Sequence, residues 1–286
     1  MASSPLAPGL ENAWDAQVQL PTGVHVWMST RQGGVSRAPW DSLNLGEHVG
    51  DAPEAVAGNR ARLQQALGAR PVFLRQVHGT DVLELGPETV AGQADACFTF
   101  ATGVACTIQV ADCLPVLLWD RQGQWVAAAH AGWRGLAGKG GCGVLEALWQ
   151  ALAARGAQAA QTSAWLGPCI GPGAFEVGPE VKAAFCLAPP SVPASAEPRT
   201  ILAATQATTQ AATQAAFVPG RGDRWWADLP QLARLRLRAL GVRDVTGNDG
   251  SAPWCTVSGV GRFFSHRRDA ARLGSSGRMA ACIWRD

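Results

Sequence analysis

Three short apolar runs in the middle of the chain constrain its fold more than any other feature. They cover residues 107–110, 116–119 and 125–129. Short apolar runs bounded by Gly, Pro, Asp or Asn are typical of β-strands, so the sequence predicts three buried strands in succession. Cys113 follows the first run and His130 follows the third. Strand ends are rigid yet reach solvent, so a thiol and an imidazole could converge there.

The flanking segments alternate between strand and helix patterns without a regular strand–helix–strand repeat. Predicted helices begin near Pro53 after an Asp51 cap, run from Val144 towards Gly156, and follow an Asp228 cap as far as Gly241. Predicted strands cover residues 25–29, 255–257 and 279–284, with a basic loop after 257 and a hairpin over 72–85 that turns at His78, Gly79 and Thr80. This mixture predicts the α+β class.

The chain is expected to form one domain over residues 1–286. Its 286 residues are 47% apolar, which is enough for one sizeable core. Residues 1–13 are predicted to be a flexible lead. Residues 188–220 are rich in Ala, Pro, Thr and Gln, and predict a low-complexity insert that is mobile or loosely helical. Too little chain follows this insert to form a second core.

Charge and cysteine usage restrict the classes of partner. The formal net charge is only +2 and the signs are mixed along the chain, so neither nucleic acid nor a membrane surface is expected as a partner. There is no signal-peptide pattern and no apolar run of about 18 residues, which predicts a cytoplasmic protein. Eight cysteines without a CxxC pair predict reduced thiols. We expect a monomer that acts on small molecules.

His78, Cys113 and His130 are candidate metal ligands, because each is predicted at a turn next to a strand. Two histidines and one cysteine thiolate are a common zinc set that leaves a fourth position open. An open zinc site can activate a water molecule. Spacing alone, however, favours the plainer interpretation of structural histidines and a buried cysteine.

Two further segments are candidate anion sites. The segment AGWRGLAGKGG places Arg134, Lys139 and several glycines before a predicted helix, where backbone N–H groups could bind phosphate. It lacks the GxxxxGK[ST] spacing, and its glycines could simply serve tight turns. The segment FFSHRRD could direct the Arg267 guanidinium inward, where it would bind phosphate or carboxylate.

Several long motifs resemble the laccase-domain family, also called the multicopper polyphenol oxidase or purine nucleoside phosphorylase family. They include RQVHGTDV, ADACFTFATGVACTIQVADCLPVLLWD, AAAHAGWRG, WLGPCIGPGAFEVGPEV, CTVSGVGRFFSHRRD with a trailing GRMA, and TRQGGVSRAPWDSLNLGEHVGD. The resemblance extends from about residue 24 to the end, and only the segment 188–220 departs from it.

The resemblance implies a layered α/β/β/α fold with mixed sheets and a zinc site at His78, Cys113 and His130. It also implies phosphorolysis of adenosine, inosine and methylthioadenosine, and deamination of adenosine. Catalytic residues would be Cys113, His130 and Asp112, and substrate-binding residues Asn44, Arg60, Gln76, Arg134, Ser265 and Arg267.

Three alternatives stay open. Multicopper oxidation is excluded by ligand supply, because the chain has only five histidines, but copper could occupy the same His/Cys/His site and support polyphenol oxidation. A metal-free cysteine hydrolase would use Cys113 as nucleophile and His130 as base, on an amide or a cell-wall precursor. The twelve tryptophans are also compatible with a binding module that uses a Trp-rich surface, although most of them are expected in the core.

Overall fold

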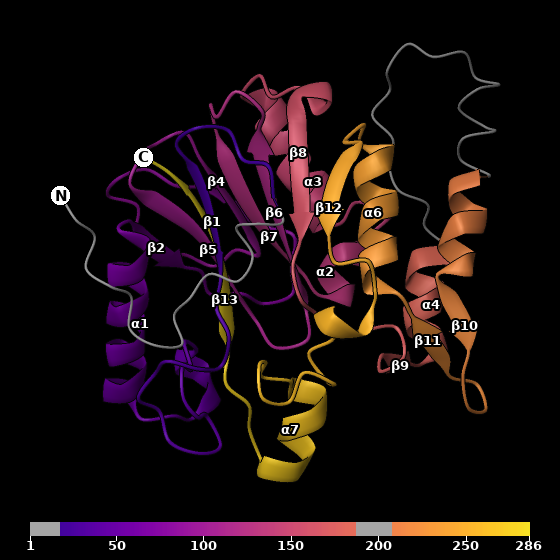
Figure 1. Ribbon diagram of the computed structural model, residues 1–286. Coiled ribbons are helices and arrows are strands. Elements are labelled where there is room, and N and C mark those ends of the chain that lie inside the picture. The colour runs from indigo at the N-terminus through magenta and orange to yellow at the C-terminus, as the bar shows by residue number, and fades with distance from the viewer. Residues whose placement is uncertain (1–17, 187–207) are drawn as a thin grey trace.

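Two mixed β-sheets lie between outer helices, as Figure 1 shows. The computed structural model describes residues 18–186 and 208–286. The strands are β1 (Val24–Met28), β2 (Arg70–Phe73), β3 (Val82–Glu84), β4 (Ala96–Thr99), β5 (Val104–Val110), β6 (Leu114–Asp120), β7 (Val126–Ala131), β8 (Thr162–Leu166), β9 (Glu176–Val177), β10 (Phe217–Pro219), β11 (Trp225–Ala227), β12 (Asp244–Gly247) and β13 (Met279–Arg285). The main helices are α1 (Pro53–Leu67), α2 (Trp133–Ala137), α3 (Val144–Ala154), α4 (Pro179–Cys186), α6 (Leu229–Ala239) and α7 (His266–Leu273). The predicted α+β class is confirmed.

Strand order defines two main sheets and a small third one. The four-stranded sheet runs β1-β13-β5-β2, with β2 parallel to β5 and the other pairs antiparallel. The six-stranded sheet runs β12-β8-β6-β7-β4-β3, with parallel pairs at both edges. The strands β10, β11 and β9 form the third sheet. The three central strands predicted from the sequence are therefore β5, which belongs to the four-stranded sheet, and β6 and β7, which belong to the six-stranded sheet.

Side-chain alternation along the strands produces the layers. In β13, Met279 and Ile283 belong to the core between the two sheets, whereas Cys282 and Trp284 pack in a separate core with Leu63 of α1. This follows from the two-residue period of a strand. A third core joins the far face of the six-stranded sheet to α3 and α6. The predicted order of helix, sheet, sheet and helix is confirmed.

The predicted hairpin over residues 72–85 is wrong. β2 pairs with β5 in one sheet and β3 pairs with β4 in the other, so the chain crosses between sheets at this point. Two apolar runs around a turn are compatible with a hairpin or with a crossing, because local pattern does not specify the partner strand. His78 lies in this crossing segment rather than in a hairpin turn.

Two predictions near the C-terminus are also wrong. Residues 255–257 form no strand, only a single bridge between Cys255 and Cys169. The basic segment after them is the helix α7 rather than a loop. Its N-cap is Ser265, whose hydroxyl accepts a hydrogen bond from the Arg268 backbone N–H at 3.2 Å. A serine cap before a charged, alanine-containing run is a helix signal that outweighs the nearby glycines.

The helix caps agree with the sequence in one of two cases. Asp228 caps α6 as predicted, accepting from the Gln231 backbone N–H at 2.9 Å. The N-cap of α1 is Ala52, so Asp51 does not hold that position. The Asp51 carboxylate instead accepts hydrogen bonds from the Ser36 hydroxyl and the Asn44 amide.

The predicted flexible lead at residues 1–13 lies outside the described residues, and so do residues 188–207 of the predicted insert. The insert ends earlier than predicted, because residues 208–215 are helical and Phe217 begins β10, which pairs with β11. Thr213 and Phe217 are buried, so this part of the low-complexity segment belongs to the core.

In residues 18–186 and 208–286, no helix combines the length and apolarity needed to cross a bilayer.

A buried ion pair joins α3 to α6. Arg236 donates to Glu146 at 3.0 Å and to the carbonyl oxygen of Gly141 at 2.7 Å. The same Glu146 carboxylate accepts from the Gly143 backbone N–H at 2.8 Å. The glycine-rich start of α3 is therefore filled by the chain's own carboxylate, and the anion site predicted for that segment is not available there.

Replacing Glu146 by alanine should lower the free energy of unfolding by about 3–5 kcal/mol, because Arg236 would stay buried without its partner. Denaturant unfolding measures the change. The matched control is Glu84→Ala, which breaks the half-exposed pair with Arg155 and should cost less than about 1 kcal/mol. Equal effects in both variants would contradict a structural role for the buried pair.

Candidate active site

Three segments from the two sheets bring His78, Cys113 and His130 together. His78 lies in the crossing between β2 and β3, Cys113 between β5 and β6, and His130 one residue before the end of β7. Their ligand atoms all lie within 4.8 Å of one another, and Cys113 Sγ is 3.6 Å from His78 Nε2. The sequence prediction that these three side chains converge is confirmed, and the group could hold a metal ion.

The backbone around the cluster is unusual. Among the described residues, His78 and Asp112 are the non-glycine positions with positive φ, at 61° and 88°. Such conformations cost energy and persist where the surroundings fix them, often at functional sites. Gly132 gives the cluster room, because a Cβ there would lie 2.8 Å from His78 Cδ2 and 3.0 Å from Cys113 Sγ.

Asp95 is the buried carboxylate that holds the cluster in place. Its side chain accepts hydrogen bonds from the backbone N–H groups of Val77, His78 and Gly79 at 3.1, 2.9 and 2.7 Å. It also accepts from His130 Nδ1 at 2.8 Å, and none of its surface is exposed. Because Nδ1 donates to Asp95, Nε2 is the ring nitrogen that faces Cys113.

Sequence reasoning missed Asp95. The available signal was a charged residue between two alanines, directly before the buried strand β4. A carboxylate in an apolar run needs hydrogen-bond donors when it is buried. Nothing in the local pattern indicates that these donors come from residues 77–79 and 130.

The cluster forms a thiolate–imidazolium pair. Burial raises the pKa of Cys113, but His130 and His78 outweigh this effect and bring the pKa to about 6. Burial lowers the pKa of His130, whereas the Cys113 thiolate and Asp95 raise it to about 9. Burial also raises the pKa of Asp95, but the hydrogen bonds from His130, Gly79 and Val77 lower it overall. Cys113 is therefore a thiolate at neutral pH.

The chain's own residues fit a zinc ion. Two imidazole nitrogens and a thiolate sulfur are donors that zinc prefers, and three protein ligands leave a fourth position for substrate or water. Cys113 supplies its thiolate without a metal being needed to deprotonate it. The hydrogen bond to Asp95 gives His130 the orientation and tautomer of a ligand.

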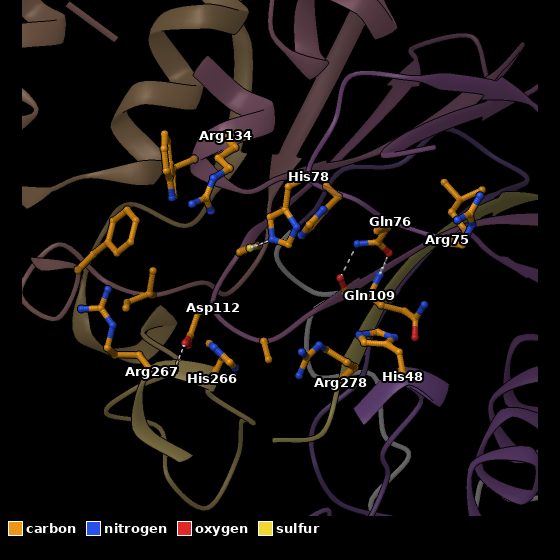
Figure 2. A pocket seen from close by; sticks show the side chains of 17 residues that line it. His48, Arg75, Gln76, His78, Gln109, Asp112, Arg134, His266, Arg267 and Arg278 are labelled. Atoms are coloured by element: carbon orange, nitrogen blue, oxygen red, sulfur yellow. Dashed lines mark hydrogen bonds between the residues drawn. The ribbon is translucent and has the colours of Figure 1, made fainter. Parts of the chain in front are cut away.

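The cluster forms part of the wall of a cavity of about 630 Å³. Figure 2 shows the cavity with Gln76, Gln109, Arg75, His48 and Arg278 on one side of His78, and Arg134 and Arg267 on the other. Four lining side chains are arginines, and Asp112 is the single acidic residue among the lining residues. Such an excess of positive charge suits an anionic ligand.

Asp112 uses both carboxylate oxygens within the protein. One oxygen accepts from the Thr256 hydroxyl at 2.5 Å and the other from the Arg267 backbone N–H at 2.6 Å. The second contact lies in the first turn of α7, where a negative charge is favourable. Asp112 therefore ties the β5–β6 turn to the helix that carries Arg267.

Arg134 and Arg267, two of the predicted substrate residues, line the cavity. The Arg134 guanidinium lies 4.4 Å from the Trp133 ring centre, and its side chain is exposed to solvent. Arg267 donates to the carbonyl oxygen of Glu176 at 3.1 Å. Gln76 also lines the cavity, but its amide bonds both the N–H and the carbonyl oxygen of Gln109, each at 2.8 Å. Lys139, the other cation of that glycine-rich segment, is exposed and is not a lining residue.

Asn44, Arg60 and Ser265 are not among the residues that line the cavity. The Asn44 side chain accepts from the backbone N–H groups of Gly46 and Arg278. Arg60 bonds the carbonyl oxygen of Leu45 and the Glu47 carboxylate, and Ser265 caps α7. These three side chains shape the segments around the cavity rather than its surface.

Several lining residues were missed by sequence reasoning because they come from segments far apart in the chain. They are His48, Leu74, Arg75, Gln109, Ala111, Trp133, Ile170 and Phe175. His266 and Arg278 also line the cavity, and the sequence placed them in and behind the FFSHRRD segment without a role of their own. Arg278 stands just before β13 and brings a half-buried cation into the site, where its charge acts on Cys113 and Asp112. An isolated arginine or histidine in a loop carries no local sign of such a role.

Comparisons with known proteins agree with this geometry. A family model described as multi-copper polyphenol oxidoreductase laccase matches residues 25–286. A purine nucleoside phosphorylase of Pseudomonas aeruginosa is 46% identical over 275 residues, covering 96% of this chain and 98% of its own length. The purine nucleoside phosphorylase YfiH of Escherichia coli is 45% identical over 267 residues, covering 92% and 95%. A crystal structure of a Neisseria meningitidis protein superposes with a TM-score of 0.74 at 41% identity, covering 93% and 96%.

The ionised Cys113 can be tested by alkylation of the metal-free protein. Because its pKa is about 6, the rate of modification by iodoacetamide should rise with pH and be half-maximal near pH 6. Peptide mass spectrometry measures the rate at each cysteine. Cys186 is the control, since burial raises its pKa and it should react only at alkaline pH. A Cys113 profile like that of Cys186 would contradict the ion pair.

Proposed function

This chain belongs to the multi-copper polyphenol oxidoreductase laccase family, and on that premise we propose that it is a metal-dependent purine nucleoside phosphorylase. Two close relatives carry the name purine nucleoside phosphorylase, and the chain covers nearly their whole length. The observation that carries the proposal is the His78, Cys113 and His130 cluster on the wall of an arginine-rich cavity. A metal site beside an anion-binding surface suits a reaction between a nucleoside and phosphate.

The proposed substrates are adenosine, inosine and methylthioadenosine, each with orthophosphate. Deamination of adenosine is proposed as a second reaction of the same cavity. The proposed metal is zinc, held by His78, Cys113 and His130, because three protein ligands with an open position are the usual catalytic zinc arrangement. Copper is the alternative in the same site, because it outranks zinc for most nitrogen and sulfur donors. A cytoplasmic, monomeric enzyme remains our expectation.

The metal would supply Lewis acidity and an activated water in this cavity. For phosphorolysis, Arg134 and Arg267 would hold orthophosphate through charge-assisted hydrogen bonds and turn one oxygen towards C1′ of the ribose. The bond from C1′ to the base nitrogen then breaks and its electron pair passes to the purine. The same guanidinium groups neutralise the charge of the attacking phosphate.

Asp112 is proposed as a positioning residue rather than as a proton donor. Both of its oxygens are engaged, by the Thr256 hydroxyl and by the Arg267 backbone N–H. Its proposed contribution is to fix the start of α7 and so the place of the Arg267 side chain.

A metal-free cysteine hydrolase is the second candidate, and the thiolate–imidazolium pair favours it. Cys113 has a pKa of about 6, pairs with the His130 imidazolium, and lies 3.6 Å from the His78 imidazole, which is the arrangement of an activated nucleophile. The substrate would then be an amide or a cell-wall precursor. Metal content separates the two candidates, because a bound ion engages the thiolate and should block its alkylation.

The proposed function is tested by incubating purified, zinc-loaded protein with adenosine, with and without orthophosphate, and separating the products by chromatography. Phosphorolysis gives adenine and ribose 1-phosphate only with phosphate, and deamination gives inosine in both cases. His78→Ala, Cys113→Ala and His130→Ala should lose most of the zinc and both activities, because two remaining donors hold the ion weakly. Absence of both products from the zinc-loaded protein would refute the proposal.

Arg134→Ala and Arg267→Ala should each raise the KM for phosphate by about ten-fold or more, because a lost charge-assisted hydrogen bond costs about 1.5–3 kcal/mol. Deamination, which uses no phosphate, should change much less. Initial rates at varied phosphate concentration measure the KM for phosphate in each variant. Arg62→Ala is the control, since Arg62 is an exposed cation on α1. An equal loss of both reactions in Arg134→Ala and Arg267→Ala would assign the arginines to the nucleoside or to the fold.

A further inference from the structure

Gln109 presents an amide to the cavity that the protein leaves without a partner. It is the penultimate residue of β5, and its side chain is only 6% exposed. Its carbonyl oxygen Oε1 is buried and has no hydrogen-bond partner among the described residues. Figure 2 shows this side chain beside His48, on the side of His78 away from Arg134 and Arg267. Buried polar atoms are nearly always satisfied, so an orphan carbonyl at a cavity wall indicates a ligand group.

The protein fixes the backbone of Gln109, whose side chain lines the cavity. The Gln76 side chain bonds both the backbone N–H and the backbone carbonyl oxygen of Gln109, so it continues the pairing of β2 with β5 beyond the last backbone pair at Phe73 and Thr107. Neighbouring Ile108 and Val110 are buried in the core between the sheets. The alternation of the strand then directs Gln109 to the opposite face. A clamped backbone holds a recognition group in one place.

The chemistry of the amide restricts the ligand. The Gln109 carbonyl oxygen needs a hydrogen-bond donor, and phosphate offers mainly acceptors. Acceptor atoms of a ligand on this side of the cavity would instead receive hydrogen bonds from Arg75 and Arg278. An amide also carries an N–H donor next to its acceptor, so its complement has a donor and an acceptor side by side. The edge of a purine at its 6-position has this pattern, and a glutamine amide can bind it through two hydrogen bonds.

We propose that Gln109 is the specificity-determining residue that reads the 6-position of the purine. This inference rests on the proposed phosphorylase function and places the base opposite Arg134 and Arg267, which hold phosphate. With a 6-amino purine the Gln109 carbonyl accepts from the amine, and its N–H donates to the ring nitrogen. With a 6-oxo purine the amide turns over, so that its N–H donates to the oxygen and its carbonyl accepts from the ring N–H. One side chain thereby accommodates both adenosine and inosine.

Gln109→Glu tests this assignment, because a carboxylate only accepts hydrogen bonds. With adenosine it accepts from the amine but repels the neighbouring ring nitrogen, and with inosine it accepts from the ring N–H but repels the oxygen. The kcat/KM for each nucleoside, from initial rates of adenine and hypoxanthine release, should therefore fall by about ten-fold or more. Gln65→Glu, which adds the same charge at an exposed position of α1, should leave both values unchanged. An unchanged kcat/KM for either nucleoside in Gln109→Glu would overturn the assignment.

Gln109→Met provides a second, independent variant of similar size without hydrogen-bonding groups. Inhibition by hypoxanthine should weaken by about ten-fold or more, while inhibition by ribose 1-phosphate should stay within about two-fold. The reverse pattern would place the ribose, not the base, at Gln109 and overturn the inference. If the wild-type protein released neither base, the proposed function would fail first. Activity in the wild-type protein together with unchanged kcat/KM values in Gln109→Glu would refute the role of Gln109 alone.

Discussion

The buried carboxylate of Asp95 is the contact on which the site depends. A carboxylate with no exposed surface is tolerated only where donors surround it, and here three backbone N–H groups and one imidazole do so. The three N–H groups belong to the segment that crosses from one sheet to the other, and the imidazole belongs to β7. One side chain therefore fixes His78 by its backbone and His130 by its ring. Cys113 completes the cluster from the β5–β6 turn.

The cavity follows from the same arrangement of two sheets. The strands β5, β6 and β7 are consecutive in the chain, but β5 lies in the four-stranded sheet and β6 and β7 lie in the six-stranded sheet. The ends of these strands and the β5–β6 turn therefore bring Gln109, Asp112, Cys113 and His130 to one place. The arginines come from segments around this edge, and the Asp112 carboxylate ties one of them, Arg267, to the turn. The His78, Cys113 and His130 cluster, the cations and an unpaired amide thus face one cavity of about 630 Å³.

Much of this fold could be predicted from the sequence, because burial and capping leave local patterns. The strands near residues 107, 116 and 125, the Asp228 cap and the helix that begins near Pro53 all follow such patterns. Strand pairing leaves no such local pattern, and the residues around His78 predict a hairpin where the chain crosses between the two sheets. Predicting His78, Cys113 and His130 as candidate metal ligands required the motif resemblance as well as the residues themselves. Asp95 and Gln109 could not be found in this way, because their roles depend on contacts with segments distant in the chain.

The most direct test of the account is the zinc affinity of Asp95→Asn. An asparagine keeps the size of the side chain but cannot both accept from His130 Nδ1 and serve the crossing backbone. Competition with a metal indicator should show zinc bound about 10–100-fold more weakly than in the wild type. Asp120→Asn, which replaces a buried carboxylate that bonds Gln122 and Gln124 at the far end of β6, should bind zinc normally. Wild-type zinc affinity in Asp95→Asn would contradict the account.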